Sequence, residues 1–213
     1  MDKNYHITTG NYLDYELHPS KTYITEYLDK LNYIFEEITT RYKRVLYVRF
    51  DLRFQQQGEY DGKAISEFFA KLNNILKSKK YNQTNAKYFW VREMDTSSKP
   101  HYHCLLLLDY NKTRYAGFPN GYKAAGLMKT INEIWCGILN TQEAALVNLC
   151  DSNVNFKFIN RDKPESKKAI FTHCAYLCKF ETKAFNISGK NIGHSQINMN
   201  IKNKPPRTHQ NKP

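Results

Sequence analysis

The sequence predicts an α+β domain in which helices pack against one mainly antiparallel sheet. Two hydrophobic patterns alternate along the chain: apolar residues recur at helical intervals in some segments and at every second position in others. The resulting order is helix, strand, helix, hairpin, helix, one or two strands, helix. This order is typical of a layered domain in which helices cover a sheet of antiparallel strands.

Size and charge limit the possible functions. The chain has 213 residues, of which 41% are hydrophobic, which suits one well-buried core. Its 32 Lys and Arg against 20 Asp and Glu leave a net charge of +12, so nucleic acid or another anionic surface is the expected partner. The N-terminus shows no signal pattern and the longest apolar run, residues 104–108, is far too short to cross a bilayer, which predicts a cytoplasmic protein with no membrane contact. Five cysteines without a C-x-x-C pair are expected to be reduced.

The first half of the chain predicts two helices and the first strand. Residues 20–41 carry apolar residues at helical spacing after Ser20, a suitable N-cap. Residues 44–54 alternate between an apolar face and a charged face, as a half-buried strand does. The charged face consists of Arg49, Asp51 and Arg53. Residues 61–80 again have helical spacing.

The middle of the chain predicts a hairpin. The stretches AKYFWVREMD (86–95) and HYHCLLLLDY (101–110) read as strands joined by the polar, proline-containing turn at 96–100. The second strand is apolar on both faces, so we expect it in the centre of the sheet with a layer on each side.

The remaining segments complete the sheet and its cover. A helix is expected at 126–139, one or two strands within 145–160, and a last helix at 166–184. After Glu181 no acidic residue remains, although lysines and an arginine do. We therefore expect residues 186–213 to be a mobile basic tail or a poorly packed extension that adds salt-sensitive affinity for nucleic acid. Residues 1–43 are expected to be an N-terminal segment and helix that pack on the core.

Two histidines at the start of the central strand form a candidate metal site. Residues two apart on a strand point the same way, so His101 and His103 share one face and Tyr102 takes the other. Glu93 lies across the predicted hairpin and supplies a carboxylate. Two imidazoles and one carboxylate leave coordination positions open, as a catalytic site requires. The alternative is that both histidines are ordinary residues at the rim of the core.

A tyrosine further along the chain offers a nucleophile. Tyr176 and Lys179 are three residues apart in the last predicted helix, at the edge of its buried arc, so both can reach one small volume. A phenol is a poor nucleophile at neutral pH, and a nearby cation favours its phenolate. A divalent ion on the histidines would withdraw charge from a phosphodiester and orient it for in-line attack. The alternative is a tyrosine at the rim of the core among solvated lysines.

These residues together resemble the HUH endonucleases, a superfamily named for its His-hydrophobe-His motif, in which Tyr102 here takes the middle place. The Y-x-x-K of Tyr176 and Lys179 resembles the single-tyrosine replication initiators. The successive stretches YFWVREMDTSSKPHYHCLLLLD, GLMKTINEIW, AYLCKFETK and NIGHSQ are similar to the replication proteins of filamentous phages and related prophages. The similarity runs from about Arg44 to Gln196.

The resemblance implies a five-stranded, mainly antiparallel sheet of ferredoxin- or RRM-like type, with residues 44–185 as the endonuclease domain. It implies Mg²⁺ or Mn²⁺ on His101 and His103, with Glu93 chosen here as third ligand. It also implies that Tyr176 nicks single-stranded or hairpin origin DNA, retains the 5′ end as a phosphotyrosine and initiates rolling-circle replication of a phage or mobile element in a bacterial cytoplasm. The chain has no G-x-x-x-x-G-K-[ST] motif, so a host helicase and polymerase are the expected partners.

Several assignments stay open at this point. Four basic side chains are candidates for contact with DNA: Arg49, Arg53, Arg92 and Lys183. His173 and Asp51 are candidates to assist the metal or the phenol. Two other functions remain as alternatives: strand transfer in transposition or mobilisation, with the same chemistry, and a non-catalytic RRM-like module that binds nucleic acid.

Overall fold

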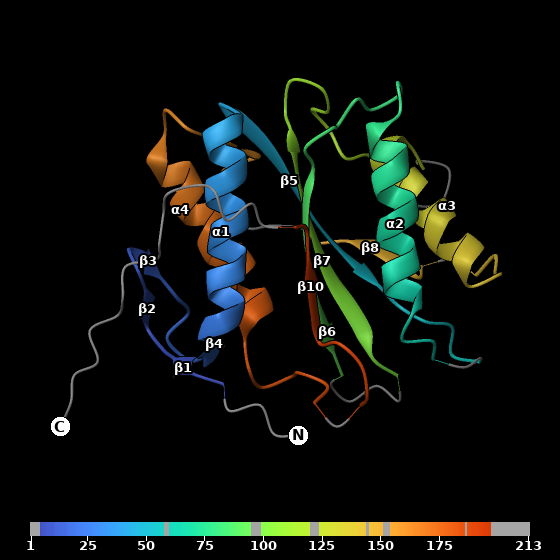
Figure 1. The fold of residues 1–213 in the computed structure, drawn as a ribbon, viewed down its shortest axis with the longest axis horizontal. Helices are drawn as coiled ribbons and strands as arrows, with labels where there is room; N and C mark the ends of the chain where they lie inside the picture. The colour runs from blue at the N-terminus through green and yellow to red at the C-terminus, as the bar shows by residue number, and fades with distance from the viewer. Residues whose placement is uncertain are drawn as a thin grey trace.

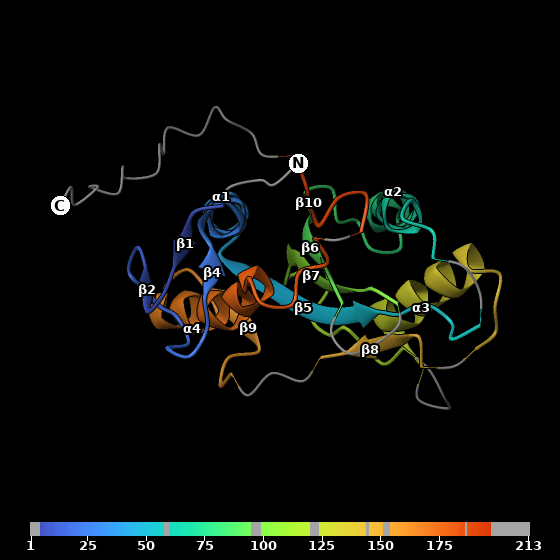
Figure 2. The ribbon, with the colours of Figure 1, turned by 90° about the horizontal axis from the view of Figure 1, so that it is seen from below.

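The protein is an antiparallel sheet with two helices on each face. The computed structural model describes residues 5–57, 60–94, 99–119, 124–143, 145–150, 154–185 and 187–196. Figures 1 and 2 show α1 (Thr25–Arg41) and α4 (Pro164–Ala175) on one side of the sheet, and α2 (Ala64–Lys77) and α3 (Gly126–Ile138) on the other. The predicted α+β class with a mainly antiparallel sheet is confirmed.

The main sheet has the strand order β10-β6-β7-β5-β8, and all of its pairings are antiparallel. A further strand, β9, pairs with residues 44–46 of β5, whereas β8 pairs with residues 50–52 of β5. The strands β8 and β9 therefore share one position in the sheet. The strands are β5 (Arg44–Leu52), β6 (Lys87–Glu93), β7 (His101–Asp109), β8 (Val147–Leu149), β9 (Phe158–Asn160) and β10 (Ile192–His194). The turn predicted between β6 and β7 lies largely outside the described residues.

The central position of β7 is confirmed by its burial. It pairs with β6 on one side and β5 on the other, and its four leucines, residues 105–108, are completely buried. Alternation along the strand divides them between two cores: Leu105 and Leu107 pack toward α1 and α4, whereas Leu106 and Leu108 pack toward α2 and α3. By the same alternation, His101 and His103 lie on the α1 and α4 face, and Tyr102 is buried on the opposite face.

Helix α1 begins five residues later than the sequence predicts. Ser20 does not cap it, because residues 23–24 form the short strand β4 (Tyr23–Ile24), which pairs with β1 (Ile7–Thr8). A second small hairpin joins β2 (Asn11–Tyr12) to β3 (Tyr15–Glu16). The N-terminal segment therefore has its own strands, and its buried tyrosines belong to the same core as α1 and α4.

The last helix is shorter than predicted. Helix α4 ends at Ala175, and residues 176–178 form the 3₁₀ turn η1 (Tyr176–Cys178). Lys179 then has extended backbone geometry, and the backbone N–H of Phe180 donates to the carbonyl oxygen of Thr22. The helix stops because the following residues pair with the N-terminal segment, a contact that helical spacing alone does not reveal.

The predicted mobile tail is wrong for residues 187–196. Strand β10 pairs with residues 89–91 of β6 and forms one edge of the sheet. Gly193 lies opposite Trp90, and a Cβ at this position would come within 2.3 Å of the indole ring, so a side chain there would have to displace the tryptophan. The rest of the predicted tail, residue 186 and residues 197–213, lies outside the described residues.

The five cysteines form no disulfide, and Cys104, Cys174 and Cys178 are buried. This agrees with the expectation that they are reduced. Within the described part of the chain, no helix combines the length and apolar character needed to cross a bilayer.

Candidate metal and tyrosine site

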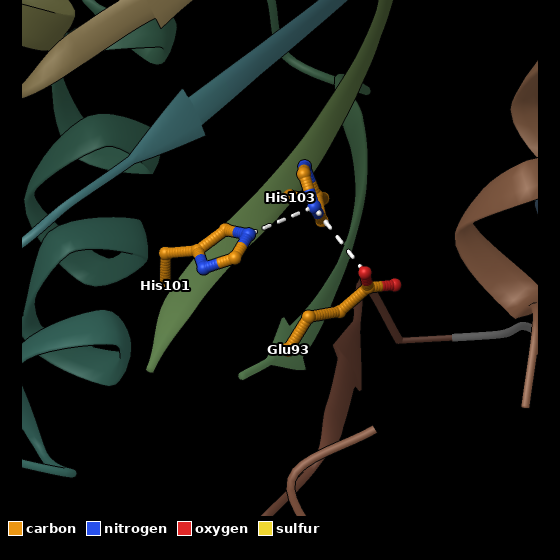
Figure 3. Close-up of side chains that lie close together, drawn as sticks. All are labelled: Glu93, His101 and His103. Atoms are coloured by element: carbon orange, nitrogen blue, oxygen red, sulfur yellow. Dashed lines mark hydrogen bonds and ion pairs between the residues drawn. The ribbon is translucent and has the colours of Figure 1, made fainter. Parts of the chain in front are cut away.

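Three possible metal ligands converge where β6 and β7 meet. Glu93 ends β6, His101 and His103 begin β7, and one ligand atom of each lies within 4.8 Å of the others. The Nε2 atoms of the two histidines are 3.1 Å apart, and His103 Nε2 is 3.4 Å from Glu93 Oε2 (Figure 3). Atoms that bind one ion at about 2.1 Å are separated by about 3.0 to 3.4 Å. The spacing and the mixed nitrogen and oxygen donors therefore fit a divalent cation.

Asp51 fixes the orientation of His103. In the register of β5 and β7 these two residues are directly opposite, and Asp51 Oδ1 lies 2.5 Å from His103 Nδ1. A proton held on Nδ1 leaves the Nε2 lone pair directed at His101 and Glu93, as in metal sites where a carboxylate supports a histidine ligand. The charged face predicted for β5 thus contributes directly to the site.

The pKa values of the two histidines shift in opposite directions from the ordinary value. Burial opposes protonation of His103, but its hydrogen bonds to the carboxylates of Asp51 and Glu93 outweigh this effect and raise the His103 pKa. Burial and the neighbouring His103 lower the pKa of His101. His101 is therefore a neutral imidazole at neutral pH, which is the form that binds a metal.

Glu93 is a buried carboxylate surrounded by donors. Lys183 Nζ lies 2.5 Å from its Oε1, Lys179 Nζ lies 3.2 Å from its Oε2, and the Thr182 hydroxyl donates to Oε2. Burial alone would raise the pKa of Glu93, but His103 and Lys183 outweigh it, so the pKa lies far below its ordinary value. Glu93 therefore stays ionised, and its charge is balanced inside the protein.

Lys179 connects this cluster to Tyr176. Its Nζ is 4.3 Å from the centroid of the Tyr176 ring, in addition to its contact with Glu93. The Tyr176 side chain is 38% exposed, so substrate can reach it from solvent. The predicted proximity of Tyr176 and Lys179 exists, although a 3₁₀ turn and an extended residue produce it rather than a continuous helix.

Two of the candidate DNA-binding residues have internal partners instead. The Lys183 side chain is completely buried against Glu93. Arg92 is also buried, and its guanidinium donates to three acceptors in the segment before β10, Asn191 Oδ1 and the carbonyl oxygens of Ile187 and Ser188, and also to Tyr60 Oη. Neither cation is presented to a DNA phosphate in this structure. Sequence reasoning missed both roles, because Glu93 is 90 residues from Lys183 and Asn191 is 99 residues from Arg92.

Arg49 and His173 form a pair beside the site. Arg49 Nη1 lies 2.9 Å from His173 Nε2 and 3.1 Å from the His173 carbonyl oxygen. Burial, with the Arg49 charge, lowers the His173 pKa to about 4, so this imidazole is neutral and accepts the hydrogen bond. His173 does not belong to the group of metal-ligand candidates found among the described residues. Among the four candidate DNA-binding residues, Arg53 is the most exposed, so its charge is the one most accessible from solvent.

Comparison with known proteins places the chain in a family. The family model described as the YagK/YfjJ C-terminal domain matches residues 9–195. The chain is 26% identical to the "Uncharacterized protein YagK" of Escherichia coli (strain K12) over an alignment of 201 residues, which covers 83% of this chain and 95% of that protein. No solved structure matches significantly. Because the family model spans most of the chain and every residue of the site, the protein belongs to the YagK/YfjJ C-terminal domain family.

Proposed function

We propose that this protein is a metal-dependent DNA nickase and strand transferase of the HUH type, which initiates rolling-circle replication of a phage or mobile element. The observation that carries the proposal is one connected cluster: His101 and His103 lie against Glu93, and Lys179 contacts both Glu93 and Tyr176. Lys179 thus contacts both the candidate metal site and the candidate nucleophile. His103 and Tyr176 are 73 residues apart in the sequence (176 − 103).

The topology supports the proposal. The consecutive elements β5, α2, β6, β7, α3 and β8 have the spatial strand order β6-β7-β5-β8. A βαββαβ unit in which β7 lies between β5 and β6 is the split βαβ of ferredoxin-like folds. This is the arrangement that the resemblance to HUH endonucleases implies, and in it both histidines lie on the face that α4 and η1 cover.

The proposed metal ligands are His101, His103 and Glu93. An ion held there, Mg²⁺ or Mn²⁺, would withdraw negative charge from the scissile phosphodiester. Asp51 keeps His103 in the ligand tautomer, and Lys179 and Lys183 keep the carboxylate of Glu93 ionised within a buried environment. Substrate oxygens and water would occupy the remaining coordination positions.

Tyr176 is the proposed nucleophile. Its phenolic oxygen forms a bond to the phosphorus, the bond from phosphorus to the 3′ oxygen breaks, the phenolic proton passes to water and the leaving oxygen takes a proton from water. Lys179, held against the ring, stabilises the phenolate by electrostatic attraction. The phosphotyrosine retains the energy of the broken bond, so the transfer can be reversed to join strands. The free 3′ hydroxyl would prime synthesis by a host polymerase after a host helicase opens the duplex.

The proposal is tested by searching for the covalent adduct. The protein is incubated with Mn²⁺ and a pool of single-stranded DNA that includes origin sequences from its own replicon, and is then analysed by denaturing mass spectrometry. We expect an adduct on Tyr176 that disappears in Tyr176→Phe and in EDTA. Tyr115→Phe is the matched control, because Tyr115 is 62% exposed and belongs to no part of the proposed site.

The result also separates the alternatives. An adduct that survives Tyr176→Phe or EDTA would contradict the assigned nucleophile or the metal. No adduct with any sequence would favour a non-catalytic nucleic-acid-binding protein. An adduct formed only with terminal sequences of a mobile element would assign the same chemistry to transposition or mobilisation.

A further inference from the structure

A large groove lies beside the sheet edge formed by β10. Its volume is about 1160 Å³, and side chains of α1 and α2 are among those that line it. In the ribbon of Figures 1 and 2, β10 lies between these two helices. The lining is rich in aromatic residues: Tyr5, Tyr27, Phe69, Tyr88, Trp90, Phe180 and Phe185. Among the residues that the structure describes, the lining includes Lys30 and Lys190 but no Asp or Glu. An aromatic groove with cations and no acidic residue suits a ligand that has flat rings and negative charge.

Three of these aromatic side chains form a continuous series, which we name the aromatic ladder: Phe180, Phe185 and Tyr5. The rings of Phe180 and Phe185 have centroids 5.4 Å apart, and those of Phe185 and Tyr5 are also 5.4 Å apart. Phe180 and Phe185 are 40% and 41% exposed, so much of their ring surface contacts solvent. Neighbouring exposed aromatic rings that a core does not cover are typical of binding surfaces.

The ladder begins four residues after the proposed nucleophile in the sequence. Phe180 directly follows Lys179, the residue that contacts both Tyr176 and Glu93. From there the ladder continues into the groove. The ladder and the proposed nucleophile are thus linked through Lys179.

We propose that the aromatic ladder and its groove bind the unstacked bases of single-stranded DNA next to the cleavage position. The identity of this strand as substrate rests on the proposed nickase function, whereas the binding itself needs no metal and no cleavage. Aromatic side chains stack on bases of any sequence, and lysines attract the phosphates. Paired bases in a duplex expose only their edges, so the ladder requires a single strand. The net charge of +12 and the absence of acidic side chains in the groove favour DNA over an acid-rich or neutral peptide or a second copy of this basic chain.

The test compares two aromatic pairs. Affinity for a fluorescein-labelled oligothymidine of about 15 nucleotides is measured by fluorescence anisotropy in EDTA, so that no cleavage occurs. Phe180→Ala with Phe185→Ala is expected to weaken binding at least about tenfold, because stacking is worth about 1–3 kcal/mol per base. The matched control is Tyr115→Ala with Phe118→Ala, a second exposed pair whose ring centroids are 5.9 Å apart, and we expect wild-type affinity for it.

Two further variants show how the ladder acts. Phe180→Leu with Phe185→Leu keeps the apolar volume and hence the fold, but removes the ring faces, so it should lose affinity as the alanine pair does. Lys190→Ala should reduce the dependence of affinity on salt, since one cation fewer is available to the phosphates.

Equal affinity of the wild type and both Phe180/Phe185 variants would overturn the proposal. Loss of self-association in these variants without loss of DNA affinity would instead assign the ladder to contact between copies. The test is independent of the adduct experiment. Weaker DNA binding by the Phe180/Phe185 variants, with no adduct formed by the wild type, would support the ladder and contradict the nickase. An adduct on the wild type, with unaltered DNA binding by these variants, would support the nickase and contradict the ladder.

Discussion

Replacing Asp51 by Asn is expected to weaken Mn²⁺ binding although it removes no proposed ligand. Asp51 Oδ1 accepts a hydrogen bond from His103 Nδ1 at 2.5 Å, and the neutral amide keeps the shape but loses the charge. Loss of such a supporting partner lowers metal affinity by about 10- to 100-fold, or about 1.4–2.8 kcal/mol.

The size of this effect should depend on pH. Burial lowers the pKa of His103, but Asp51 and Glu93 outweigh it and raise the pKa, so in the wild type protons compete with the ion as the pH falls. Asp51→Asn removes one cause of the raised pKa and therefore weakens this competition. The difference in affinity between wild type and variant should be largest near pH 8.5 and smaller near pH 6.

The assay is a Mn²⁺ titration in which the signal of the free ion is followed by electron paramagnetic resonance at both pH values. Asp162→Asn is the control, because Asp162 forms a surface ion pair with Lys43 and is 57% exposed. Equal Mn²⁺ affinity of wild type and Asp51→Asn at pH 8.5, or a larger difference at pH 6, would refute the reasoning.

Three further predictions concern stability. Lys183→Met breaks a buried ion pair with Glu93 and is expected to lower the free energy of unfolding by about 3 kcal/mol. This is the lower end of the usual range, because Lys179 still pairs with Glu93. A change below about 1 kcal/mol in urea denaturation would contradict this. His173 has a pKa near 4, below that of an unfolded histidine, so its contribution to the free energy of unfolding is present above about pH 6.5 and is lost as the pH falls toward 4. Over this pH range the free energy of unfolding of His173→Gln should therefore fall by about 1–2 kcal/mol less than that of the wild type. Parallel curves of unfolding free energy against pH would disprove the account. Arg92→Met removes the donor to several part-buried acceptors and should speed proteolytic cleavage within 187–191, whereas unchanged cleavage would show that these hydrogen bonds do not hold the segment.

The parts of the fold that the sequence predicted correctly depend on local patterns. Alternation in residues 44–54 and in the hairpin strands places apolar side chains on defined faces, and the structure has β5, β6 and β7 in these segments. The placement of His101 and His103 on one face follows from the two-residue period of a strand. Such features need no knowledge of distant residues.

The parts that could not be predicted depend on distant partners. Strand β10 has only three residues, and its pairing with β6 depends in part on Arg92, whose partner Asn191 is 99 residues away. The end of α4 depends on pairing between residues 179–180 and the N-terminal segment. Lys183 looked like a surface cation because its charge partner, Glu93, lies 90 residues earlier. Residue spacing contains no signal for these contacts.

The order in which the chain is synthesised separates the two halves of the site. A ribosome that has completed residue 160 has made Asp51, Glu93 and both histidines, but neither Tyr176 nor the lysines that balance Glu93. A nascent or truncated chain of this length would therefore have the imidazoles without the nucleophile, and its Glu93 would lack two charge partners. Under the proposed function, cleavage therefore begins only once the last segment has been made and has docked onto β6.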